Sequence, residues 1–129
     1  MFVAVGAFVL RNKVRRSGRN GLLLGMFGTV EENEVRESQE AGIMTYGKSN
    51  RLIKNTVKEN LGPGAKLAGP DNYVARNLFQ GNTAGALAAS ADGSLGCDQE
   101  ANVFLLPSGE VDETGITRRS ERGGDAWSQ

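Results

Sequence analysis

MFVAVGAFVLRNKVRRSGRNGLLLGM, residues 1–26, is the stretch from which the rest of the chain is interpreted. It contains five basic residues and no acid, and the first carboxylate is Glu31. The cations lie between two apolar runs, neither of which approaches the roughly 18–20 residues that span a bilayer. A secretory signal places its charges before the apolar region, whereas transit peptides are rich in Arg and nearly free of acids. The stretch therefore predicts an organelle presequence over residues 1–26; the alternative is a basic arm that stays on the mature protein.

The start Met1-Phe2-Val3-Ala4, with Phe8 and the Arg and Ser residues that follow, resembles the plastid presequences of red algae and their descendants. The resemblance implies a chloroplast location, in the stroma or at the thylakoid. Such peptides are usually rich in Ser and Thr, and Ser17 is the only hydroxyl residue of this stretch. A mitochondrial location therefore stays open.

The composition after Met26 indicates an acidic chain with little apolar material. This part has 10 basic and 15 acidic residues, although the whole chain is neutral. A nucleic-acid binder normally carries a basic field, so we expect no nucleic-acid partner. Residues 27–129 contain only 20 Leu, Ile, Val and Phe, together with 14 of the 18 glycines. A chain of this kind is expected to order against partners rather than around a core of its own.

The predicted fold class is mainly α, with short helices joined by Gly/Pro-rich linkers and extended or irregular segments, and with no large independent core. Helices are expected over 30–41, 50–60 and 71–80. Thr29 and Glu32 form a capping-box pattern before the first, and Asp71 and Gly81 suit the two ends of the third. Val103-Phe104-Leu105-Leu106 is expected to form a strand, with Pro107-Ser108-Gly109 as the turn of a small hairpin over 103–111. The domain organisation is then a presequence over 1–26, a helical and extended region over 27–111, and a polar tail over 112–129.

The residue types argue against an enzyme and against a metal site. The chain has no histidine and one cysteine, Cys97, so the usual general base and a zinc ligand set are missing. No cofactor is required. A bilin on Cys97 through a thioether is a further hypothesis, weighed against the more common role of a lone cysteine as a small buried hydrophobe.

Aromatic and aliphatic side chains are the candidate partner-binding residues. The stripe within 71–80 is the densest apolar feature after Met26, and it predicts either a docking surface or packing in a core. Two aromatic residues nearer the C-terminus add further anchors. The full set is Tyr73, Val74, Leu78, Phe79, Phe104 and Trp127.

The resulting functional prediction is a non-enzymatic accessory or linker subunit of a large plastid photosynthetic assembly, a phycobilisome or a photosystem antenna. The presequence pattern points to the plastid, and the thin apolar supply points to a chain that lies along larger neighbours. The alternative is an accessory subunit of a mitochondrial complex. The sequence has no transmembrane segment, and peripheral membrane association is possible.

Overall fold

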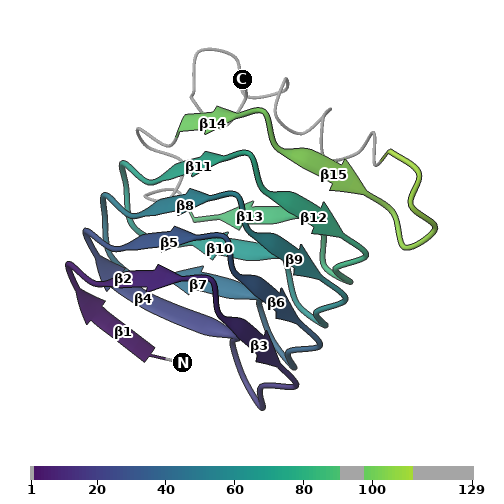
Figure 1. The fold of residues 1–129 in the computed structure, drawn as a ribbon, viewed down its shortest axis with the longest axis horizontal. Coiled ribbons are helices and arrows are strands. Elements are labelled where there is room, and N and C mark those ends of the chain that lie inside the picture. The colour runs from purple at the N-terminus through teal and green to yellow at the C-terminus, as the bar shows by residue number, and fades with distance from the viewer. Residues whose placement is uncertain (1, 91–97, 112–129) are drawn as a thin grey trace.

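Fifteen short β-strands form the described part of the chain, which in the computed structural model is residues 2–90 and 98–111. They build three parallel five-stranded sheets (Figure 1). Sheet A contains β1 (Phe2–Val5), β4 (Leu22–Met26), β7 (Ile43–Thr45), β10 (Ala65–Leu67) and β13 (Leu87–Ala89). Sheet B contains β2 (Phe8–Leu10), β5 (Thr29–Glu31), β8 (Arg51–Ile53), β11 (Tyr73–Ala75) and β14 (Asp98–Glu100). Sheet C contains β3 (Lys13–Arg15), β6 (Glu34–Arg36), β9 (Thr56–Lys58), β12 (Leu78–Gln80) and β15 (Val103–Leu105).

The chain visits the three sheets in turn, so each circuit is one coil of a parallel β-solenoid of about four turns. Asparagines at the same place in successive coils give the length of the repeat. Asn12 and Asn33 are 21 positions apart, and Asn33 and Asn55 are 22 apart. The last circuit is longer, since Asn77 and Asn102 are 25 positions apart. The strand pairing follows the same repeat: along sheet B, Phe8 pairs with Thr29, Thr29 with Arg51, Arg51 with Tyr73 and Tyr73 with Asp98.

A corner of fixed construction joins sheet B to sheet C in every coil. The residue after the sheet B strand has a positive φ, which is 60° at Glu32, 56° at Lys54 and 55° at Arg76. This left-handed conformation is uncommon for residues other than glycine, and here it turns the chain between two three-residue strands. An asparagine follows each of these residues, as at Asn33 and Asn55.

The asparagines stack into a ladder inside the corner. The Asn55 side chain accepts hydrogen bonds from the Asn33 backbone N–H at 2.9 Å and the Asn33 amide at 3.0 Å. Its own amide donates to the Val30 carbonyl and to Asn77 Oδ1, both at 2.9 Å. Buried backbone groups at the corners need such partners, because an unpaired one costs about as much as a lost hydrogen bond. A second ladder links Asn50 to Asn72 and a third links Asn60 to Asn82.

The core is a continuous column of apolar side chains inside the coils. Each sheet supplies one inward residue or two per coil, and the residues of successive coils stack on one another. In sheet C the column ends in Phe79 and Phe104, whose rings stack with centroids 5.8 Å apart. The column comprises Val9, Leu22, Leu24, Val30, Val35, Ile43, Leu52, Val57, Ala65, Leu67, Val74, Phe79, Ala86, Leu87 and Phe104. The expectation of no large independent core was wrong, because a solenoid needs few apolar residues per coil to fill its narrow interior.

Close contact between coils explains several of the glycines. A Cβ on Gly42 would lie 2.5 Å from Val57 Cγ1 and 2.7 Å from the Gly64 carbonyl oxygen. Gly64 occupies the same place one coil later and faces Phe79 in the same way. These glycines let neighbouring coils approach, and they are not signs of a linker.

The three predicted helices are absent: residues 30–41, 50–60 and 71–80 each form strand, corner and strand. The features that indicated helix ends mark corners instead. Glu32, Asp71 and Gly81 all have φ near 60°, which is the conformation that also ends many helices. The described residues contain no helix, and hence none that could cross a membrane.

The small hairpin expected over 103–111 is present at the end of the described chain. β15 is followed by a turn in which the Gly109 N–H bonds the Leu106 carbonyl at 2.8 Å. Leu105 and Val111 then pair as an antiparallel bridge. In the structure this hairpin extends from the last strand of sheet C.

Candidate functional site: a basic face on sheet C

The outward side of sheet C carries an excess of positive charge over the first three coils. We call the outward residues of β3, β6 and β9 the basic face; they are Lys13, Arg15, Glu34, Arg36, Thr56 and Lys58. Four are cations and one is a carboxylate, on a chain whose net charge is zero. On the same coils, the outward side of sheet B carries one cation and one carboxylate, Arg51 and Glu31. The excess therefore belongs to sheet C.

Three cations of the basic face stand in register, one per coil. Arg15 pairs with Arg36, and Arg36 pairs with Lys58. Neighbouring strands lie about 4.8 Å apart, and like charges placed directly opposite one another are destabilising. Glu34 relieves part of this repulsion, since its carboxylate lies 3.4 Å from Arg36 Nε and 4.0 Å from Arg15. Arg36 Nε makes no hydrogen bond in the structure, so the contact with Glu34 is one of charge alone.

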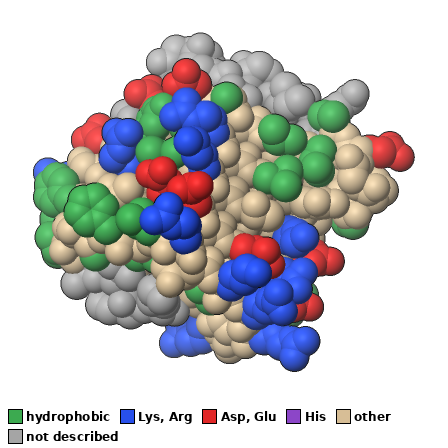
Figure 2. Space-filling view, viewed as in Figure 1, with side chains coloured by type: hydrophobic (Ala, Val, Ile, Leu, Met, Phe, Trp, Pro, Cys, Tyr) green, Lys and Arg blue, Asp and Glu red, His purple; other side chains and the backbone are tan. Residues whose placement is uncertain are grey.

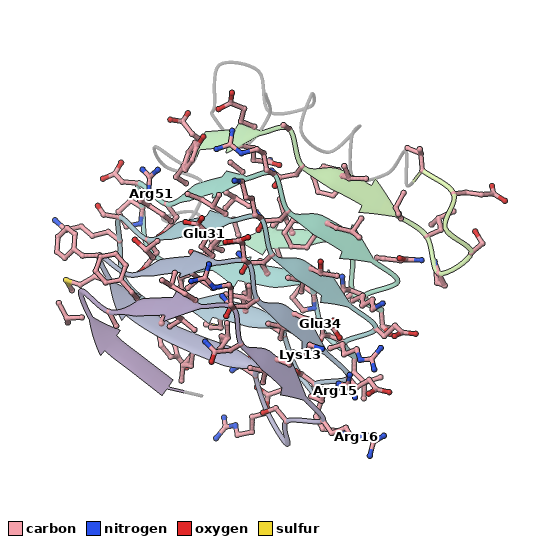
Figure 3. All side chains as sticks on the ribbon, in the orientation of Figure 1. Lys13, Arg15, Arg16, Glu31, Glu34 and Arg51 are labelled. Carbon is pink, nitrogen blue, oxygen red and sulfur yellow. The ribbon has the colours of Figure 1, made fainter. Side chains whose placement is uncertain are left out.

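A groove runs along the corner between sheets B and C, beside the basic face. Its volume is about 400 Å³. It crosses three successive coils and is lined by Arg11, Asn12, Lys13, Glu32, Asn33, Glu34, Lys54 and Thr56. We call it the corner groove. Figure 3 shows Lys13 and Arg15 close together with Glu34 just above them, whereas Glu31 and Arg51 lie apart on sheet B.

Three lysines of this region keep their charge available. Within the described residues, the ammonium groups of Lys13, Lys54 and Lys58 have no ion-pair partner. The two carboxylates of the corner groove are both engaged, Glu32 with Arg11 at 3.8 Å and Glu34 with the arginines of the basic face. The arrangement can accept an anion at the lysines and offers hydrogen-bond acceptors between them.

Four of the five cations of residues 1–26 lie within 4.0 Å of a carboxylate in the next coil, and Lys13 is the exception within the described residues. Arg16 lies 3.7 Å from Glu37, and Arg19 lies 3.5 Å from Glu40. The second coil thus supplies carboxylates at the positions that match these cations. Pairs as exposed as these contribute little stability, typically about 0–1 kcal/mol each. These four cations of the predicted presequence therefore have partners within the fold.

The partner-binding residues predicted from sequence are divided between the core and the surface. Val74 and Phe79 are buried in the core, which is the alternative considered for the stripe within 71–80. Phe104, predicted as a separate anchor, is buried as well. Tyr73 and Leu78 are partly exposed, on different sheets. Cys97 and Trp127 lie outside the described residues, so a bilin on Cys97 and docking through Trp127 stay predictions.

Tyr73 joins two charged neighbours on sheet B. Its hydroxyl donates a hydrogen bond to Glu100 at 2.9 Å, and the Arg51 guanidinium lies 5.1 Å from the centre of its ring. The hydrogen bond to Glu100 is the main cause that raises the pKa of Tyr73 above its ordinary value of 10.0; burial and the charge of Glu100 add to it. Because the Arg51 guanidinium already covers the ring, we interpret Tyr73, Arg51 and Glu100 as a stabilising cluster on the surface and not as a binding site.

Apolar residues replace the cations at the far end of sheet C. In the strand register of sheet C, Leu78 and Val103 occupy on β12 and β15 the place that Lys13 has on β3. Leu105 occupies on β15 the place that Lys58 has on β9. Val103 is 48% exposed, and Leu106 and Val111 beside it are 42% and 56% exposed. We call these five apolar residues the apolar end. Figure 2 shows Lys and Arg side chains gathered at the lower right, over the first strands of sheet C, with a hydrophobic group above them.

Sequence reasoning missed the basic face because its members are far apart along the chain. Lys13 and Arg15 were grouped with a presequence, whereas Arg36 and Lys58 fell on the polar sides of predicted helices. The available signal was the interval, because Arg15, Arg36 and Lys58 recur at the same spacing as the asparagines of the ladder. An alignment of the sequence with itself at that interval brings them together.

Comparison with known proteins identifies the family and corrects the predicted identity. No curated protein and no solved structure matches the chain. The family model described as periplasmic copper-binding protein (NosD) matches residues 4–102, and this range includes most of the predicted presequence. The resemblance to red-lineage photosynthetic linkers was therefore wrong, as were the chloroplast and mitochondrial locations and the linker function derived from them. Because the match covers more than three quarters of its length, the chain belongs to the NosD family.

Proposed function

We propose that this chain is a non-enzymatic binding module of the periplasm that holds an anionic polymer along the basic face. The observation that carries the proposal is the row Arg15–Arg36–Lys58, three cations in register on neighbouring strands. Two unit charges about 4.8 Å apart, the spacing of neighbouring strands, repel by about 1 kcal/mol in water. Glu34 offsets part of this repulsion, and an anion bound along the row offsets more of it. The sheet fixes the backbone positions of the three residues, so only their side chains have to be ordered on binding.

The location is taken from the family. Its description names periplasmic proteins, and the same compartment is proposed here. Fractionation of cells that make the native protein tests it, since recovery in the cytoplasm would contradict the assignment.

The copper in the family description is not part of the proposal. Copper is held in proteins by thiolate, thioether and imidazole donors. This chain has no histidine, one cysteine and three methionines. Within residues 2–90 and 98–111, no three His, Cys, Asp or Glu side chains come together around a common point. The described residues therefore do not fit a copper site.

Binding to dextran sulfate, measured against uncharged dextran, tests the proposed function. We expect binding to the sulfated polymer only, weakening as salt rises because exposed charges are screened. Arg36→Gln and Lys58→Gln should each weaken binding about threefold to tenfold. Arg51→Gln and Lys66→Gln remove cations from the other two sheets and serve as controls. Equal losses in all four variants would show that charge alone is responsible and that the basic face is no site.

The apolar end favours a second candidate function, the docking of a partner protein. Exposed apolar side chains that cluster on one face often mark such interfaces. Val103 and Val111 are the most exposed members of the apolar end. Under this candidate, Val103→Ser should leave polyanion binding unchanged and release any protein that co-purifies with the chain.

A further inference from the structure

We infer that the polymer bound at the basic face is a linear acidic polysaccharide, lying along the solenoid axis with its hydroxyl groups in the corner groove. The inference rests on the proposed function and adds the ligand class. Three observations carry it: the charges of the groove, its hydrogen-bonding groups, and the row of cations beside it.

The charges of the corner groove disfavour a ligand that is only anionic. Glu32 and Glu34 line the groove between Lys13 and Lys54. A chain of closely spaced carboxylates, sulfates or phosphates would meet these two glutamates as well as the lysines. The ligand therefore has to place hydrogen-bond donors at the glutamates and negative charge at the cations.

Sugar hydroxyl groups meet the first requirement. A hydroxyl both donates and accepts, so it can donate to the carboxylates of Glu32 and Glu34 and accept from the Thr56 hydroxyl or a lysine. The corner groove supplies donors and acceptors side by side over three coils. An acidic sugar unit combines such hydroxyls with one carboxylate.

The row of cations meets the second requirement. Arg15, Arg36 and Lys58 follow one another at the strand spacing of about 4.8 Å, on the same three coils that the corner groove crosses. A sugar chain that lies along these coils can therefore place carboxylates at the cations while its hydroxyls face the groove.

Titration calorimetry of the full chain with four oligomers of matched length tests the inference. The probes are oligogalacturonate, its fully methyl-esterified form, an uncharged glucose oligomer and oligoglutamate. We expect oligogalacturonate to bind, and the ester and the glucose oligomer to bind at least tenfold more weakly, because they lack the carboxylates. Oligoglutamate should also bind at least tenfold more weakly, because it lacks hydroxyls that could donate to Glu32 and Glu34.

Two substitutions separate the charge from the hydroxyl recognition. Lys58→Gln should weaken oligogalacturonate about threefold to tenfold. Thr56→Val keeps the charge and the shape and should weaken oligogalacturonate about twofold to tenfold, the range for one hydrogen bond, while leaving dextran sulfate unchanged. Lys66→Gln on sheet A is the matched control and should change neither.

The outcomes distinguish the inference from the function on which it rests. Oligoglutamate binding as tightly as oligogalacturonate, or ester binding as tightly as acid, overturns the acidic polysaccharide and leaves an anion-binding face. Failure of every anionic probe, dextran sulfate included, overturns both.

Discussion

Replacement of Asn55 by alanine is the sharpest test of how the solenoid is held together. Asn55 is 1% exposed and lies in the middle of the ladder between sheets B and C. The substitution leaves the Asn33 backbone N–H without its acceptor and removes the side-chain hydrogen bond to the Val30 carbonyl. It also breaks the links to the side chains of Asn33 and Asn77.

The expected cost follows from the groups left unpaired. A buried donor or acceptor without a partner costs about 1–3 kcal/mol. The Asn33 N–H carries this cost, and the lost hydrogen bonds to Val30, Asn33 and Asn77 add about 0.5–1.5 kcal/mol each, so with some relief from relaxation or an entering water we expect a loss of about 3–5 kcal/mol. This is a large part of the roughly 5–15 kcal/mol that typical domains have. At about 4 °C per kcal/mol for a chain of this size, the melting temperature should fall by roughly 12–20 °C.

Urea unfolding followed by circular dichroism measures the effect, with Asn12→Ala as the matched control. Asn12 is at the first coil of the same ladder and is half-buried, and its amide bonds the Leu10 carbonyl and Asn33 Oδ1. Its loss leaves no deeply buried group unpaired and should cost less than about 1.5 kcal/mol. If the two variants lost equal stability, the ladder would not have the role described here.

Two further predictions concern the coil contacts and the surface of sheet B. Gly42→Ala should destabilise the protein by about 1–3 kcal/mol in thermal unfolding, because the added Cβ has no room between the coils. Gly18→Ala is the control: nothing lies within 4 Å of a Cβ at that position, and stability should change by less than about 1 kcal/mol. Similar losses in the two variants would contradict the close packing of coils. In a Tyr46→Phe background, ultraviolet titration should give Tyr73 a pKa above 10.0 that Glu100→Gln lowers, and an unchanged pKa would refute the hydrogen bond as its cause. Since the folded pKa is the higher one, the stability gained from this bond is present below about pH 10 and is lost as pH rises through the folded pKa.

Local sequence signals predicted the turn chemistry but not the fold. Pro107-Ser108-Gly109 indicated a hairpin turn, and a turn is present there. At Thr29–Glu32 and Asp71 the same kind of reasoning proposed helix starts, because polar residues and glycines favour helix ends and solenoid corners for related reasons. Leu52 and Val57 are five positions apart and fit one face of a helix only loosely. They fit a solenoid better, because each is the buried middle residue of a three-residue strand.

The long-range pattern needed the repeat. Four of the five cations of residues 1–26 have their partners one coil later, at Glu32, Glu34, Glu37 and Glu40, beyond the window of any local rule. The buried asparagines were also informative, since a polar residue recurring between apolar ones at a fixed interval indicates stacked coils. Reading that interval would have predicted the solenoid and placed Arg36 beside Lys58.

Backbone amide shifts of the isotopically labelled chain, recorded by NMR during titration with oligogalacturonate, test the central claim most directly. The account predicts shifts confined to β3, β6 and β9 and to the corner groove beside them, with the amides of β10 and β13 on sheet A unchanged. Shifts that centre on Arg51 or Lys66, or that spread evenly over all exposed cations, would contradict a binding site on the basic face.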